Sequence, residues 1–188
     1  GRAERAVQMV EDMMRTYLSA LESRIKCKVP TQHPVMRWLF EHAGNMLNRF
    51  TTNPDGVTPY AALHGRNPVE RHVEFGEKVF YYVPKRARSK LCLRWRLGIY
   101  LGCAANSNEC YVANVDGDVL KSRSVARVVA DARWDADAVQ KVKGVPGKLI
   151  GHSIAHAEFE HLEEHLDPHV DADAADRAQV DAAEPEVK

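Results

Sequence analysis

Glu4 is the first residue of this chain whose position raises a chemical question. In "GRAERAVQMV" it lies one turn ahead of a long apolar stripe, where a helix would begin. A carboxylate in the first turn of a helix interacts favourably with the helix dipole, and the residues alone favour this structural interpretation. The alternative is a metal ligand, because carboxylate oxygens suit Mg²⁺. That alternative requires further carboxylates from other segments.

A run of basic side chains is the second candidate site. The segment "PKRARSKLCLRWR" carries no acidic residue between Lys85 and Arg96. Its cations are Lys85, Arg86, Arg88, Lys90, Arg94 and Arg96, and the aromatic residues Tyr81, Tyr82 and Trp95 lie beside or among them. Such a pattern can lay charges along a phosphate backbone and offer rings for stacking. The alternative is a solvated basic loop without a ligand.

Three further cations follow in "DVLKSRSVARVV", which we interpret as one strand. Side chains alternate along a strand with period two, so Lys121, Arg123 and Arg127 are predicted to share one face. Together with the preceding run they predict a basic surface for nucleic acid. Binding of this type should depend strongly on salt and weakly on sequence.

The remaining candidates are weaker. His161, Glu164 and His165 in "HLEEH" match the H-x-x-E-H pattern of one class of zinc peptidases, but a polar helix face explains the same residues more simply. The four cysteines form no CxxC pair, which favours free thiols in a reducing compartment over a zinc knuckle.

Composition divides the chain into a basic and an acidic part. Residues 1–130 hold 20 basic and 12 acidic side chains, a net charge of +8, and residues 131–188 hold 6 and 14, a net charge of −8. No apolar run approaches the roughly 20 residues that cross a bilayer, so we expect no membrane contact. The start resembles neither a signal peptide nor an initiator segment, which suggests a piece of a longer protein.

Periodicity predicts helices first and strands afterwards. Apolar residues spaced by three or four predict helices over about residues 3–26 and 34–50. Thr58 should cap a short helix that Pro59 begins and Gly65 ends. From residue 75 onward, four or five short apolar runs predict a small twisted barrel or a meander, with an Asp-Gly hairpin in "VDGDV". The fold class is therefore α+β, with a linker after residue 134, a short amphipathic helix near 154–166 and a disordered acidic tail.

Several segments, taken in order, resemble the copia-type retrotransposon integrases. The first is "GRAERAVQMVEDMMR", and the others are "MLNRF", "GVTPYAALHGRNP", "EFGEKVFYYVP", "LRWRLGIYLGC" and "KSRSVARV". The resemblance covers about residues 1–130. It implies that residues 1–66 are the last helices of an RNase H-like catalytic core, that 67–134 form an SH3-like β-barrel, and that 135–188 are linker and tail.

The resemblance also implies a chemistry. Glu4 would be the last acid of an Asp, Asp, Glu triad that holds Mg²⁺ for DNA strand transfer. Both aspartates would lie upstream of Gly1, so we expect this chain alone to be catalytically inert. The implied partners are DNA and the upstream part of the polyprotein, with a nuclear or cytoplasmic location, and self-association is left open. The competing interpretation is a protein-interaction module, because SH3-like barrels bind proteins as readily as nucleic acid.

Overall fold

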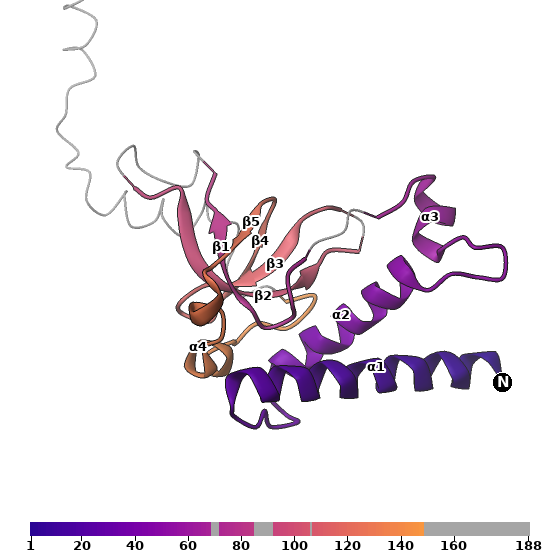
Figure 1. Ribbon diagram of the computed structural model, residues 1–188, viewed down its shortest axis with the longest axis horizontal. Helices are drawn as coiled ribbons and strands as arrows, with labels where there is room; N and C mark the ends of the chain where they lie inside the picture. The colour runs from indigo at the N-terminus through magenta and orange to yellow at the C-terminus, as the bar shows by residue number, and fades with distance from the viewer. Residues whose placement is uncertain (69–71, 85–91, 106, 149–188) are drawn as a thin grey trace, which may run out of the picture.

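The computed structural model describes residues 1–68, 72–84, 92–105 and 107–148 (Figure 1). Its elements, in chain order, are α1 (Arg2–Ile25), α2 (Val35–Phe50), α3 (Pro59–His64), β1 (Lys78–Tyr82), β2 (Trp95–Cys103), β3 (Cys110–Ala113), β4 (Val119–Ser122), β5 (Val125–Arg127), the 3₁₀ helix η2 (Ala130–Ala132) and α4 (Ala136–Gln140). The α+β class is confirmed. Among the described residues, no helix combines the length and apolar composition that a bilayer-crossing segment needs.

The three predicted helices form where the sequence places them. Lys26 adopts a left-handed conformation (φ 56°) and ends α1. Thr58 caps α3 by accepting a hydrogen bond from the Ala61 N–H, and Gly65 ends it at φ 65°. In Figure 1 the first half of α1 and the whole of α3 extend away from the sheet. Val7 and Met9 in that half of α1 are exposed, so only the second half of the apolar stripe is packed.

The sheet is open, five-stranded and antiparallel, in the order β4-β3-β2-β1-β5. The predicted Asp-Gly hairpin joins β3 to β4, with Gly117 at φ 88° and its N–H donating to the carbonyl of Asn114. The prediction of one strand over 118–129 is wrong, because the chain turns between Ser122 and Val125. Its two halves, β4 and β5, pair with β3 and β1 and form opposite edges of the sheet.

The two edges of the sheet approach each other at one corner. Only Arg123 and Ser124 separate β4 from β5, so a sheet with these strands at its two edges must curl. The Ser122 hydroxyl donates to the carbonyl oxygens of Tyr82 and Ser124, and the Tyr82 N–H donates to the Ser124 carbonyl. These bonds fix the corner against the end of β1.

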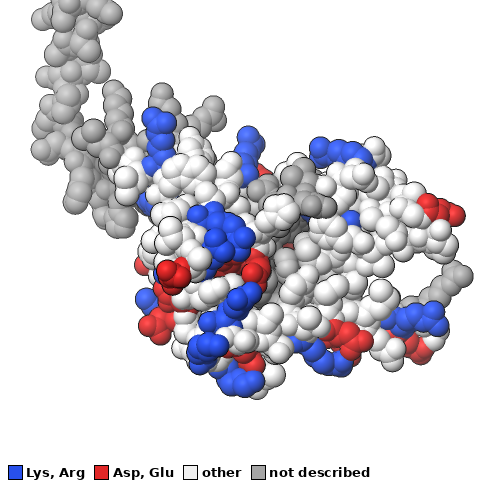
Figure 2. Space-filling view, viewed as in Figure 1, with Lys and Arg blue, Asp and Glu red and all other residues white. Residues whose placement is uncertain are grey.

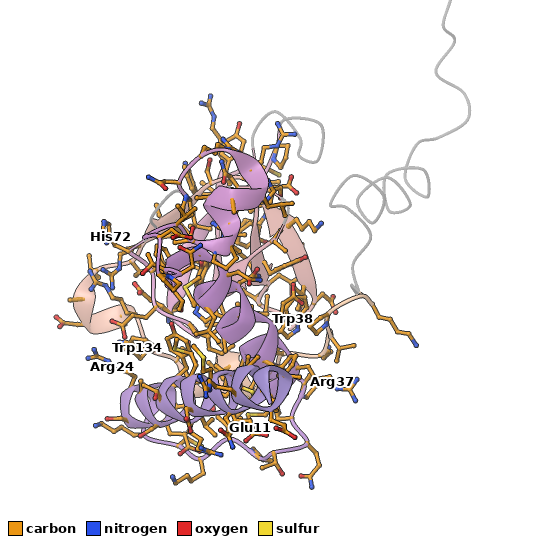
Figure 3. The ribbon with its side chains drawn as sticks, turned by 90° about the vertical axis from the view of Figure 1, so that its right-hand side faces the viewer. Glu11, Arg24, Arg37, Trp38, His72 and Trp134 are labelled. Atoms are coloured by element: carbon orange, nitrogen blue, oxygen red, sulfur yellow. The ribbon has the colours of Figure 1, made fainter. Side chains whose placement is uncertain are left out.

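Apolar side chains form two clusters, one on each face of the curled sheet. The first joins α1, α2 and α4 to the sheet, and its buried members include Leu21, Trp38, Leu39, Ile99, Leu101 and Val139. The second fills the inside of the curl, with Val79, Tyr81, Tyr100, Cys103, Cys110 and Val112 among its members. The Trp38 indole N–H donates to the Gly144 carbonyl at 2.7 Å, which ties α2 to the segment after α4. Figure 3 shows Trp38 beside α2, with Trp134 and Arg24 next to each other on the other flank.

Candidate functional site

One end of the β1–β2 hairpin brings together aromatic and basic side chains. Tyr82 and Trp95 lie opposite each other in the register, and their rings meet edge to face with centroids 5.6 Å apart. The Val83 N–H donates to the Arg94 carbonyl, so hairpin pairing continues one step beyond the strands. Arg94 and Trp95 are both exposed. The result is an aromatic pair, with Trp95 exposed and Tyr82 half-buried, and a cation directly beside Trp95 in the chain.

Arg123 belongs to the same end of the sheet, although it lies 41 positions after Tyr82 in the sequence. The Tyr82 N–H donates to the carbonyl of Ser124, the next residue after Arg123. The Arg123 side chain is 88% exposed and makes a long ion pair, 3.7 Å, with Glu109. A pair this exposed contributes little and leaves the guanidinium accessible to another anion. We call Tyr82, Arg94, Trp95 and Arg123 the hairpin-end cluster.

The other predicted basic residues divide into two groups. Lys85, Arg86, Arg88 and Lys90 lie outside the described residues, in the segment that connects β1 to β2. Arg96 lies within the described residues and is half-buried. Its partner in the strand register is Tyr81, whose side chain belongs to the cluster inside the curl. Because neighbouring residues of a strand point to opposite faces, Arg96 points away from the face of Trp95.

Lys121, Arg123 and Arg127 do not share a face, which corrects the sequence prediction. Lys121 is opposite Tyr111, and its ammonium lies 5.6 Å from the centroid of that ring. Arg127 is opposite Val79 at the other edge of the sheet. The turn at Ser124 is the reason, because it interrupts the alternation on which the prediction depended.

Arg127 is held by a buried carboxylate that sequence reasoning missed. The Nε and Nη2 atoms of Arg127 donate to the two carboxylate oxygens of Glu77 at 2.7 and 2.9 Å, and Arg133 lies 3.5 Å from the same carboxylate. Glu77 is completely buried. Its hydrogen bond raises the pKa of Arg127, so this cation serves the fold and is not free to contact phosphate.

Glu4 does not lie in a metal centre of the described structure. Its side chain is 79% exposed and pairs with the amino group of Gly1. Across residues 1–68, 72–84, 92–105 and 107–148, no group of three or more His, Cys, Asp or Glu side chains could hold a metal ion. One solvated carboxylate does not by itself make a two-metal site. The "HLEEH" residues lie outside the described part of the chain.

A cleft of about 370 Å³ opens between α1, α2 and the sheet. Two buried side chains of α2 line the cleft, those of His42 and Arg49. The His42 ring lies among Tyr17, Phe75 and Tyr100, and burial lowers its pKa to about 4, so it is neutral at pH 7. Its Nδ1 atom and the Nε atom of Arg49 have no hydrogen-bond partner among the described residues.

Arg49 was not singled out by the sequence, yet it connects α2 to two other segments. Its Nη2 atom donates to the carbonyls of Ala104 and Ser107 at 3.0 and 3.4 Å. Its guanidinium lies 4.8 Å from the centroid of the Tyr60 ring in α3. No periodic signal marks such a residue, because its partners are more than 50 positions away or in another helix.

Charge is not gathered into one continuous patch on the face drawn in Figure 2. Basic and acidic side chains alternate over the lower left of that view, and most of the remaining described surface is neither. Comparisons with protein families, with curated proteins and with solved structures found no match for this chain.

Proposed function

We propose that this protein binds nucleic acid through the hairpin-end cluster. The observation that carries the proposal is that the exposed Arg123 follows β4 at the corner where the Ser124 carbonyl meets Tyr82, and that Tyr82 pairs with Trp95 beside Arg94. Four more cations lie in the connection that begins three residues after Tyr82. Among the described residues, Arg94 and Arg123 thus bring exposed charges from two segments to the neighbourhood of one aromatic pair.

The chemistry of this cluster suits a backbone-directed interaction. Guanidinium groups attract phosphates and release condensed counterions, which makes affinity fall as salt rises. An exposed indole can stack on any base, which adds affinity without sequence preference. The described cluster has no buried donor–acceptor set of the kind that reads base edges, so we expect weak sequence specificity.

We further propose that the chain is the C-terminal part of a copia-type integrase. The support is the sequence order: a capped "TPY" helix, then the "FG" strand and the remaining short strands. In the intact polyprotein the hairpin-end cluster would help hold DNA during strand transfer. The SH3-like and RNase H-like assignments, Mg²⁺ at Glu4, self-association and the upstream polyprotein as partner are parts of this proposal. The chain alone is expected to be inactive.

The test is fluorescence anisotropy of the 188-residue chain with a short labelled DNA duplex over a salt series. Changing Arg94→Ala and Arg123→Ala together should weaken binding and reduce the slope of log affinity against log salt by about 1 for each phosphate that the variant no longer neutralises. The matched control is Arg15→Ala with Arg37→Ala, which removes the same charge from exposed positions on α1 and α2. Figure 3 shows Arg37 directed away from the sheet.

Equal loss of affinity in the two variants would mean that only net charge matters, and the proposed site would be wrong. Absence of binding at every salt concentration would reject nucleic acid as the ligand. The observation that then gains weight is a strip of exposed apolar side chains on the β1–β2 hairpin and the adjoining β3–β4 turn, formed by Phe80, Leu93, Trp95, Leu97 and Val115. Such a strip favours the second candidate function, a protein-interaction surface.

A further inference from the structure

Cys103 and Cys110 face each other across the sheet. Cys103 ends β2, Cys110 begins β3, and the two are direct partners in the antiparallel register. The next pair outward is hydrogen-bonded, because the Ala104 N–H donates to the Glu109 carbonyl at 2.8 Å. Cys103 and Cys110 are therefore a non-hydrogen-bonded pair, whose Cα atoms lie about 4.5 Å apart. Disulfides span Cα separations of about 4.4 to 6.8 Å, so this pair is within range.

The two side chains also point the same way. Both belong to the cluster inside the curl, and both are buried thiols. The Tyr100 hydroxyl lies 3.1 Å from the Cys103 sulfur. Direct partners on one face of an antiparallel pair are close enough for their Cβ substituents to meet. The register and the shared face therefore both favour a bond between the two sulfurs.

Cys103, although buried, lies beside the cleft between the helices and the sheet. It lines that cleft together with Tyr100 and His42, whereas Cys110 is fully covered. A small reagent in the cleft would therefore meet Cys103 before the completely buried Cys110. This arrangement distinguishes an attacking cysteine from a resolving one.

We propose that Cys103 and Cys110 are an oxidation site for small peroxides. The Cys103 sulfur attacks one peroxide oxygen, the O–O bond breaks, and the other oxygen leaves as water, which gives a sulfenic acid. The Cys110 sulfur then displaces the hydroxyl group as a second water and forms the S–S bond. Two thiols and one hydrogen peroxide thus yield one disulfide and two waters, with the thiols oxidised and the peroxide reduced.

The bond would lie where the sheet holds α2. The Asn45 side-chain amide donates to the Cys103 carbonyl at 2.8 Å, and Arg49 donates to the carbonyl of Ala104. Both helix residues therefore depend on the position of this strand end. Joining Cys103 to Cys110 restrains the strand end from which α2 takes its polar contacts, independently of any nucleic acid.

The test is peptide mapping of the reduced 188-residue chain after hydrogen peroxide treatment and alkylation. Both cysteines lie on one tryptic peptide, residues 97–121, because no Lys or Arg separates them. We expect this peptide to escape alkylation and to lose two hydrogen atoms, and reduction should restore both alkylation sites. A variant with Cys27→Ser and Cys92→Ser, which removes the two cysteines outside the pair, should behave in the same way.

Single variants test the order of the two steps. In Cys110→Ser, a sulfenic-acid reagent should label Cys103, whereas in Cys103→Ser the remaining Cys110 should stay a thiol. Far-ultraviolet circular dichroism checks that each variant is folded. Complete alkylation of both cysteines in the wild-type chain, under peroxide that oxidises the exposed Cys92, would overturn the proposal without use of any variant.

Discussion

The two ends of the β-sheet use arginine in opposite ways. At the end that faces the helices, Arg49 donates to buried carbonyls and Arg127 forms two hydrogen bonds with the buried Glu77. Arg94 at the hairpin end is exposed, and so is Arg123 at the corner between β4 and β5. The comparison shows that residue type alone does not identify a binding cation. A guanidinium that already has well-placed buried acceptors supports the fold, and one left in solvent is available to a ligand.

The first prediction concerns the end of the sheet that faces the helices, where buried arginine contacts stabilise the fold. Glu77→Ala should lower the free energy of unfolding by about 3 kcal/mol, because removing one partner of a buried ion pair leaves the other charge uncompensated. Chemical denaturation measures the change. The matched control is Glu11→Ala, which removes an exposed carboxylate of α1 and should change stability by no more than about 0.5 kcal/mol. An equal loss of unfolding free energy in the two variants would contradict the claim that the buried Glu77 pair stabilises the fold more than an exposed carboxylate does.

The second prediction concerns His42, which packs against the same end. Burial holds its folded pKa at about 4, below the unfolded value of about 6.5, so the unfolded chain binds the proton more tightly. Stability from this residue is therefore complete above pH 6.5 and is lost as pH falls towards 4, by about 3 kcal/mol in total. Unfolding measured from pH 7 to 4 should show this loss, and His42→Phe should reduce it. If stability fell with pH equally in the wild type and in His42→Phe, the loss could not be assigned to His42.

The third prediction targets the hairpin end. Trp95→Ala should weaken DNA binding about tenfold, since base stacking contributes about 1–3 kcal/mol. It should change the free energy of unfolding by less than about 1 kcal/mol, because the side chain is only partly covered. Phe40→Ala is the control, an exposed aromatic residue of α2. An equal loss of affinity in both variants would show that Trp95 is not a specific stacking platform.

The smallest effect should come from the cap of α3, a helix outside the hairpin end. Thr58→Ala removes the cap of α3 and should cost about 1 kcal/mol in unfolding free energy. DNA affinity should stay unchanged. Thr52→Ala, in the exposed loop before α3, is the matched control and should leave stability within about 0.5 kcal/mol. A loss of affinity in Thr58→Ala would extend the binding surface beyond the hairpin end.

The sequence predicted correctly those elements that a few neighbouring residues determine. Thr58, Pro59 and Gly65 defined α3 because capping and helix termination act over a few residues. The Asp-Gly signal defined the β3–β4 turn for the same reason. The break at Ser124 was missed because it follows from pairing with two different strands, β3 and β1.

The candidate site shows the same limit. Arg94 and Trp95 were predicted from a continuous run of residues, and the structure leaves both exposed. Arg123 was predicted together with Arg127, from which the turn at Ser124 separates it. The Glu77–Arg127 pair joins residues 50 positions apart, and the sequence around either residue does not predict which partner it binds. Charge and aromatic content can be counted in a sequence, but the accessibility of a given arginine depends on long-range pairing.

The most direct test of the hairpin-end cluster follows the three tryptophan indole N–H signals by two-dimensional ¹⁵N–¹H NMR during titration with a short DNA duplex. We predict that the Trp95 signal shifts in step with binding, whereas the buried Trp38 signal, whose N–H donates to Gly144, stays in place. An unchanged Trp95 signal at saturation, with shifts confined to other parts of the protein, would contradict the proposal that nucleic acid binds at this end of the sheet.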